Sequence, residues 1–301
     1  MAQHRHSRGH NPNRAVDSGR IAARPTLNAQ HQMTETEQDG TVNLAVDGGI
    51  ATVTFFHPKR NALPASILRR LAEAIDNAGK NPDARVVILA SEGTGAFCAG
   101  ASFDELRAVQ TFEDAKEFFS GFAHVILAMR RCPKIIIGRI QGKAVGGGVG
   151  LVAATDYSFA LDGASVRLSE LAIGLGPFVI GPVVERKVGR AAYAAMAIDA
   201  DWRDAEWAHQ HGLYTRVMDT EPALESVLPA FAHRLAGMNP EALKEIKRVL
   251  WEGTNHWETL LFERAAISGK LALSDYCKRA VERAQQSTHP TPLPGSLRTG
   301  Y

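Results

Sequence analysis

The feature that most constrains this chain is a glycine-rich stretch that directly follows a short apolar segment. Residues 135–140 predict a buried strand, residues 142–150 contain five glycines, and Leu151–Ala154 is apolar again and predicts a buried helix. Consecutive glycines let another molecule approach the backbone, and the N–H groups at a helix N-terminus stabilise negative charge. The stretch therefore predicts either a backbone site for an anionic oxygen or a turn shaped for tight helix packing.

The composition excludes several classes of protein. The chain has 301 residues, of which 45% are hydrophobic and 22% charged, as in a globular protein of one large or two small domains. No apolar run approaches the roughly 18 residues of a membrane-spanning helix, so we expect no membrane association. The three cysteines, Cys98, Cys132 and Cys277, form neither a disulfide framework nor a metal-binding pattern. These observations favour a cytoplasmic protein without a bound metal.

Both ends of the chain have the composition of disordered tails. Residues 1–40 are polar and rich in Arg, His, Asn and Gln, and residues 288–301 contain three prolines. Residues 1–32 carry a net charge of +4, which leaves −2 for the remainder, so nucleic acid is not an expected partner of the main body. Two alternatives for the first tail stay open: a transit peptide to the mitochondrial matrix, or an extension upstream of a true start at Met33.

Between the tails, predicted strands and helices alternate, which indicates an α/β fold with a mostly helical last third. A hairpin is expected around Asp47–Gly49, because alternating apolar residues flank a Gly-Gly turn. Further strands are expected at 86–90, 135–140 and 157–161. Helices are expected at about 65–78, 112–131, 177–188, 203–211, 222–236, 240–251 and 257–285.

A second glycine-rich turn, residues 93–102, follows the strand at 86–90. Two such turns can each aim a backbone N–H group at one carbonyl oxygen and so form an oxyanion hole, in which each donor contributes about 3 kcal/mol. Neither turn has the pattern of a nicotinamide-binding or an NTPase loop. The sequence therefore favours stabilisation of a developing oxyanion over phosphate binding.

Five blocks in a fixed order carry a resemblance to a known family: Pro58–Leu63, Ala96–Ala101, Gly142–Gly148, Asp156 and Ser169–Leu175. On these blocks, residues 42–285 resemble the crotonase superfamily of enoyl-CoA hydratases and isomerases. The resemblance implies a crotonase-like superhelix of stacked ββα turns, with a core over 41–220 and a helical trimerisation region over 221–287. It also implies a homotrimer or a dimer of trimers, and an acyl-CoA thioester as substrate with no separate cofactor.

The resemblance also assigns roles to individual residues. The backbone N–H groups of Ala101 and Gly147 would form the oxyanion hole, and Glu170 would be the acid/base, with a pKa raised by an apolar pocket. The positions expected to contact coenzyme A are Lys59, Arg60, Asn61, Ala62, Leu63 and Ala99. For Lys59 and Arg60, contact with the CoA phosphates and an ordinary exposed basic pair stay open as alternatives.

The sequence departs from the hydratases of this family at one catalytic position. Gly150 stands where they carry the first of their two catalytic glutamates, and Ser102 stands where the family usually has Asp. Phe178 stands where the dienoyl isomerases carry an Asp. A single glutamate favours isomerisation of an enoyl-CoA double bond. Two alternatives stay open: an atypical hydratase or dehydratase, for example of methylglutaconyl-CoA type, and a non-catalytic protein that binds CoA or RNA.

Other residues have simpler interpretations. Cys98, in the second glycine turn, is expected to be structural, because small buried cysteines are common. The aromatic residues Tyr157, Trp202 and Trp207 are interpreted as packing residues. The roles of His57, Glu185 and Arg186 are left open by the sequence.

Overall fold

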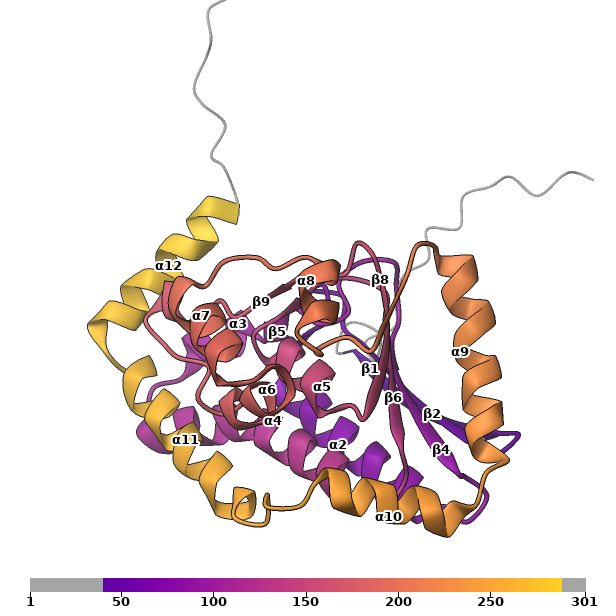
Figure 1. The fold of residues 1–301 in the computed structure, drawn as a ribbon. Coiled ribbons are helices and arrows are strands. Elements are labelled where there is room, and N and C mark those ends of the chain that lie inside the picture. Colours follow the sequence, from indigo (N-terminus) through magenta and orange to yellow (C-terminus); the bar gives the residue numbers. More distant parts are fainter. Residues whose placement is uncertain (1–39, 289–301) are drawn as a thin grey trace, which may run out of the picture. The chain divides into compact units, whose positions relative to one another are not determined.

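A computed structural model describes residues 40–288, which belong to one compact unit (Figure 1). Apart from Gly40 and Thr288, both predicted tails lie outside the described residues. The unit has the mixed α/β architecture expected from the sequence, with a central sheet and helices packed on it.

The central sheet has six strands in the order β1-β2-β4-β6-β8-β10. Their bounds are Thr41–Asp47, Ile50–Phe56, Val86–Ser91, Ile136–Ile140, Tyr157–Leu161 and Arg216–Met218. Only β1 and β2 are antiparallel, and their turn, Gly48–Gly49, has positive φ at both residues, 53° and 82°, as tight hairpins require. The sequence did not predict β10, because three residues are too short to show a periodic pattern.

Four very short strands form two small parallel pairs beside the central sheet. In one pair β3 (Ala62–Leu63) lies against β5 (Gly100–Ala101), and in the other β7 (Ala144–Val145) lies against β9 (Val166–Arg167). A bridge between Cys98 and Ala144 connects the two glycine-rich turns. The small pairs therefore bring together segments that are far apart in the sequence.

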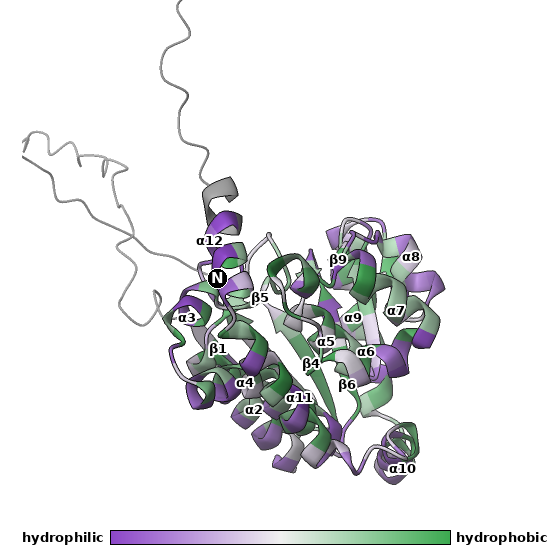
Figure 2. Ribbon diagram, turned by 90° about the vertical axis from the view of Figure 1, so that its left-hand side faces the viewer, coloured by the Kyte–Doolittle hydropathy of each residue, from purple (hydrophilic) through white to green (hydrophobic). Residues whose placement is uncertain are grey.

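Helices cover both faces of the central sheet, whose strands are largely hydrophobic (Figures 1 and 2). One face packs against helices that include α2, α4 and α5, and the other face against α9. None of the helices within residues 40–288 is both long enough and apolar enough to span a bilayer. The helix bounds are α2 Ala65–Lys80, α3 Phe103–Ala108, α4 Phe112–Arg131, α5 Gly147–Ala154, α6 Gly181–Val188, α7 Arg190–Asp199, α8 Ala205–Gln210, α9 Glu221–Ala236, α10 Pro240–Leu250, α11 Trp257–Ala272 and α12 Asp275–Thr288, with a 3₁₀ turn, η1, at Glu170–Ile173.

Three predicted helix boundaries were wrong. Helix α5 begins at Gly147, so it includes glycines that were expected to form the turn. Helix α6 begins at Gly181, with Pro182 rather than Pro177 in its first turn. The single helix expected over 257–285 is two helices, because the Ser274 hydroxyl donates to Leu271 O and accepts from Cys277 N, which ends α11 and begins α12.

A buried ion pair holds α10 to the central sheet. The Lys247 ammonium lies 2.6 Å from Asp156 Oδ2, and both side chains are 3% exposed. Asp156 also accepts hydrogen bonds from the Trp251 indole (2.9 Å) and from the Ile136 backbone N–H (2.8 Å). Asp156, one of the five blocks of the resemblance, therefore joins β6 and the start of β8 to the C-terminal helices.

We expect Lys247→Ala to lower the free energy of unfolding by about 3–5 kcal/mol, because it leaves the Asp156 carboxylate buried without its counter-charge. Lys244→Ala is the matched control on the same helix, since Lys244 forms only an exposed pair with Glu241 and should cost less than about 1 kcal/mol. Urea unfolding of both variants measures the difference. Equal losses in the two variants would contradict this role for the ion pair.

Candidate active site

The two glycine-rich turns lie in direct contact. Gly100 has φ +91°, and an ideal Cβ built on it would lie 3.0 Å from Val145 O and 3.7 Å from Gly147 N. A side chain at this position would therefore separate the two turns. This close approach brings the backbone of Ala101 and the backbone of Gly147, the two predicted oxyanion donors, to the same cavity.

Gly147 is the first residue of α5, after the N-cap residue Gly146. The first N–H groups of a helix have no acceptor within the helix and carry its positive dipole end. An ideal Cβ on Gly147 would lie 2.3 Å from Phe122 Cζ, so the aromatic ring packs directly on this backbone. Only glycine fits here without displacing Phe122.

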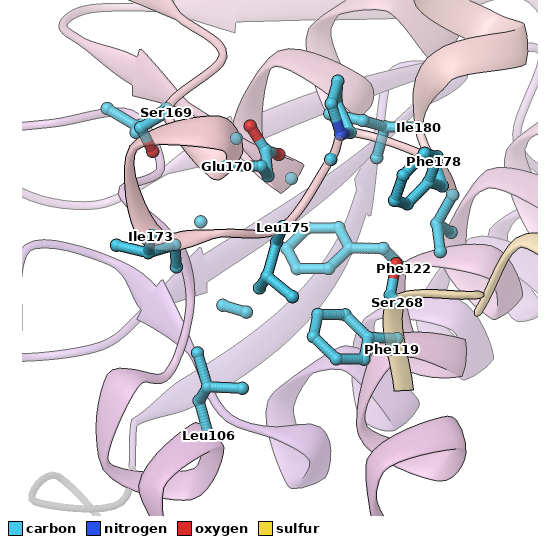
Figure 3. Close-up of a pocket in the computed structure, with 18 of the residues that line it drawn as sticks. Leu106, Phe119, Phe122, Ser169, Glu170, Ile173, Leu175, Phe178, Ile180 and Ser268 are labelled. Carbon is cyan, nitrogen blue, oxygen red and sulfur yellow. The ribbon is translucent and has the colours of Figure 1, made fainter. Parts of the chain in front are cut away.

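The cavity at this meeting point has a volume of about 90 Å³ (Figure 3). Its walls are mostly apolar and come from the phenylalanines of α4, the two glycine turns, residues 173–180 and one residue of α11. Glu170 is the only charged side chain among the lining residues of the described chain. A cavity of this size and lining suits a short apolar group next to one titratable carboxyl.

Glu170 begins the 3₁₀ turn η1, and its carboxyl group points at the glycine turn of residues 142–150. An ideal Cβ on Gly146 would lie 3.0 Å from Glu170 Oε1, so the carboxyl packs on the glycine backbone. Oε2 is buried and has no hydrogen-bond partner within residues 40–288. Burial raises the pKa of Glu170 from 4.5 to about 7, which confirms the shift predicted from the sequence.

The position that a second carboxylate would occupy is closed by an apolar side chain. An ideal Cβ on Gly150 would lie 2.5 Å from Ile180 Cγ2 and 2.8 Å from Ile180 Cβ. Ile180 itself lines the cavity, just before α6. The chain therefore lacks a carboxylate at position 150 and also lacks the space for one.

Of the six positions predicted to contact coenzyme A, only Ala99, in the second glycine-rich turn, lines the cavity; the loop 59–63 does not. The Asn61 side chain is buried and makes three hydrogen bonds to the backbone. Its Oδ1 accepts from His57 N (2.7 Å), and its Nδ2 donates to Glu92 O and to Ala96 O. Leu63 is fully buried in the core. The side chains of Asn61 and Leu63 are therefore held inside the protein, and contact of these two positions with coenzyme A stays a prediction.

The remaining positions of the loop are accessible. Lys59 and Arg60 are exposed, and Lys59 forms an ion pair with Asp104. Ala62 is half-buried in β3. The loop reaches the cavity edge through a backbone hydrogen bond from Ala99 N to Asn61 O of 3.2 Å.

Most of the other singled-out residues lie outside the cavity. Cys98 is fully buried, and burial raises the pKa of its thiol to about 12, which confirms a structural role. Tyr157 and Trp207 do pack, against Phe231 and His211 respectively.

The expectation for Trp202 was wrong. It is 44% exposed, with the charged groups of Lys143 and Arg167 at 5.0 and 5.9 Å from its ring. Glu185 and Arg186, left open by the sequence, do not line the cavity: Glu185 pairs with Arg190, and Arg186 donates to backbone carbonyls of Leu250 and Glu252.

Sequence reasoning missed three residues that shape the cavity: Phe122 on α4, Ile180 before α6 and Ser268 on α11. Phe122 and Ser268 lie on apolar or small-residue faces of their helices, and Ile180 directly precedes α6. In the sequence, each has the pattern of an ordinary packing residue. No pattern links Ser268 to a glycine turn about 120 residues earlier. Within residues 40–288, no group of three or more His, Cys, Asp or Glu side chains is arranged to hold a metal ion.

Comparison with known proteins places this geometry in a family. The model of the enoyl-CoA hydratase/isomerase family matches residues 45–266. A "Probable enoyl-CoA hydratase" of Bacillus subtilis is 26% identical over 251 residues, which cover 83% of this chain and 97% of that protein. The crystal structure of an enoyl-CoA hydratase from Bacillus halodurans superposes with a TM-score of 0.75 at 20% identity, over 80% of this chain and 99% of that chain. At 20% identity, the similarity to this crystal structure supports a shared fold and no more.

A relative with a different name is more similar over a shorter segment. The (7aS)-7a-methyl-1,5-dioxo-2,3,5,6,7,7a-hexahydro-1H-indene-carboxyl-CoA hydrolase of Rhodococcus jostii is 34% identical over 163 residues. The match covers 53% of this chain and 63% of that protein's length. Each of these names describes an enzyme that acts on a coenzyme A thioester.

We expect Glu170→Gln to stabilise the protein at neutral pH and not at acid pH. The folded state holds the Glu170 proton up to its pKa of about 7, whereas a carboxyl group with the usual pKa of 4.5 in the unfolded state releases it earlier. As the pH rises from 4.5 to 7, the free energy of unfolding of the wild type therefore falls relative to that of the variant. Above pH 7 the difference is constant at about 3 kcal/mol. Urea unfolding at pH 4 and pH 8 measures this, with the surface variant Glu185→Gln as control. A pH-independent difference would show that Glu170 is not held neutral by burial.

We also expect Gly150→Ala to lower the free energy of unfolding by about 1–3 kcal/mol, because the added methyl group overlaps Ile180. Ile180→Ala in the same chain should recover part of this loss. A double-mutant cycle measured by thermal unfolding gives the coupling between the two positions. Strictly additive effects would mean that Ile180 does not close the space beside Gly150.

Proposed function

This chain belongs to the enoyl-CoA hydratase/isomerase family, and we propose that it shifts the double bond of a short enoyl-CoA by proton transfer at Glu170. The observation that carries the proposal is a single carboxyl group, with a pKa near 7, in an apolar cavity whose other candidate acid position is filled by Ile180. One such group can both remove and return a proton at neutral pH.

In this proposal the backbone N–H groups of Ala101 and Gly147 hold the thioester oxygen. When Glu170 removes a proton from the carbon next to the carbonyl, the electron pair moves onto this oxygen and forms an enolate. Each N–H donor aimed at the oxygen stabilises it by about 3 kcal/mol. The apolar walls strengthen these interactions, because they exclude water.

Glu170 then completes the isomerisation. As a base it takes a proton from C2 of a 3-enoyl-CoA, and as an acid it gives that proton to C4. The double bond moves from C3–C4 to C2–C3, so substrate and product have the same composition and no water enters. The cavity volume of about 90 Å³ is below the 150 Å³ or so of a cavity that holds benzene, which favours short acyl groups.

Two features of the cavity argue against the hydratase alternatives. Hydration needs a positioned water, and the space for a second carboxylate at Gly150 is occupied by Ile180. A substrate carboxylate, as in a methylglutaconyl-CoA-like reaction, would meet Glu170 and no cation, because none of the described lining residues is Lys, Arg or His. A like-charged pair without a counter-ion is disfavoured in an apolar site.

Hydrolysis is the second candidate, and the similarity to the Rhodococcus hydrolase favours it. In that case Glu170 would activate a water molecule instead of moving a proton between two carbons. A purely CoA- or RNA-binding role requires no carboxyl group with a pKa near 7 in the acyl cavity. The basic tail that motivated RNA binding lies outside the described residues.

Binding of coenzyme A would use the exposed loop at Lys59 and Arg60. Arg60 is the stronger candidate for a phosphate contact, because Lys59 already pairs with Asp104. We further propose that the chain assembles as a homotrimer or a dimer of trimers through residues 221–287 and acts in the cytoplasm. A mitochondrial location would follow if the first tail is a transit peptide.

The test is a panel of but-3-enoyl-, pent-3-enoyl- and hex-3-enoyl-CoA, with products separated by chromatography. Wild type should form the 2-enoyl-CoA and no 3-hydroxyacyl-CoA or free CoA. Glu170→Gln should lower kcat at least about a hundredfold, because it removes the proton carrier. The surface variant Glu185→Gln should leave kcat unchanged. A 3-hydroxyacyl product would establish hydration, free CoA would establish hydrolysis, and a loss below tenfold in Glu170→Gln would exclude Glu170 as the acid/base.

A further inference from the structure

Besides Glu170, two serines line the cavity, Ser169 and Ser268, and neither has a role in the proposed proton transfer; Ser268 is the buried one. Ser268 lies on α11 and lines the cavity, yet it is 2% exposed. Its hydroxyl makes no hydrogen bond with any residue in the described range 40–288. The hydroxyl is not among the fully enclosed polar atoms without a partner, so it faces the cavity, where water or a bound molecule can satisfy it.

The surroundings of Ser268 are apolar. The neighbouring wall is formed by Phe118, Phe119 and Phe122 of α4, which packs along α11. In the view of Figure 3 the Phe122 ring lies between Glu170 and Ser268, and Phe119 also lines this cavity. Phe122 also packs on Gly147, so Ser268 and this proposed oxyanion donor line the same cavity on different sides of its aromatic wall.

A second buried serine on the same helix pair shows the usual arrangement. Ser120 on α4 is 3% exposed, and its hydroxyl donates to Lys116 O at 2.7 Å. Back-bonding of this kind satisfies a serine within a helix. Ser268 does not do this, so its hydroxyl remains available to whatever enters the cavity.

We propose that Ser268 recognises a neutral oxygen at the far end of the acyl group, so that the preferred substrates are short oxo- or hydroxyacyl thioesters. This inference rests on the proposed function for the placement of the thioester at Ala101 and Gly147. A serine hydroxyl donates to a ketone and either donates to or accepts from an alcohol. A carboxylate is disfavoured, because Glu170 is the only charged group that lines the cavity among the described residues.

The energetic consequence is a preference between substrates of equal length. A hydrocarbon acyl group displaces water from Ser268 and leaves the hydroxyl unsatisfied, whereas an oxygen at that point restores the hydrogen bond. The expected preference is about tenfold to hundredfold in Kd.

The experiment measures binding of saturated thioesters, which undergo no double-bond shift, by titration calorimetry. The probes are pentanoyl-CoA against 4-oxopentanoyl-CoA and hexanoyl-CoA against 5-oxohexanoyl-CoA, with 5-hydroxyhexanoyl-CoA as the alcohol. Wild type should bind an oxygen-bearing member at least about tenfold more tightly at one chain length. Ser268→Ala should reduce that ratio to near one, and the matched control Ser120→Ala should keep it.

The outcomes separate this inference from the proposed reaction. A ratio near one in wild type at both lengths, or an unchanged ratio in Ser268→Ala, would overturn the role of Ser268 even if 3-enoyl-CoA is isomerised. A ratio that depends on Ser268 in a protein that does not isomerise 3-enoyl-CoA would support oxygen recognition and reject the reaction. Thermal unfolding of both alanine variants verifies that each is folded.

Discussion

The contact between two glycine turns is the constraint on which the rest of the site depends. Gly100 approaches the backbone of Val145 and Gly147 so closely that no side chain fits between them. This contact requires that β5 and β7 lie side by side, and the small strand pairs and the Cys98–Ala144 bridge hold them there. The central sheet and its two helical layers provide the rigid frame for this arrangement.

Desolvation then defines the chemistry of the cavity. The same apolar packing that fixes the turns also surrounds Glu170 and raises its pKa to about 7. Ile180 excludes a second acid, and Phe122 packs against the proposed oxyanion donor Gly147. A site with one neutral-range carboxyl and apolar walls can take up and release a proton at neutral pH.

The sequence predicted much of the fold because its signals are local. The hairpin at Gly48–Gly49, the buried strand predicted at 86–90 and helix α4 follow from turn residues and apolar periodicity. The wrong boundaries also have local causes: glycines do not prevent a buried helix at α5, and the Ser274 hydroxyl divides α11 from α12. Strand β10 was missed because its three residues are too few to show a periodic pattern.

By itself the sequence determined the family resemblance, the two glycine turns and Glu170 as the single candidate acid, because these are residue identities at fixed spacing. Only the tertiary structure decided what surrounds them. It buried the side chains of Asn61 and Leu63, filled the space beside Gly150 with Ile180, and brought Ser268 to the cavity that Glu170 lines. These are contacts between distant segments, and no local pattern encodes which side chains meet across a cavity.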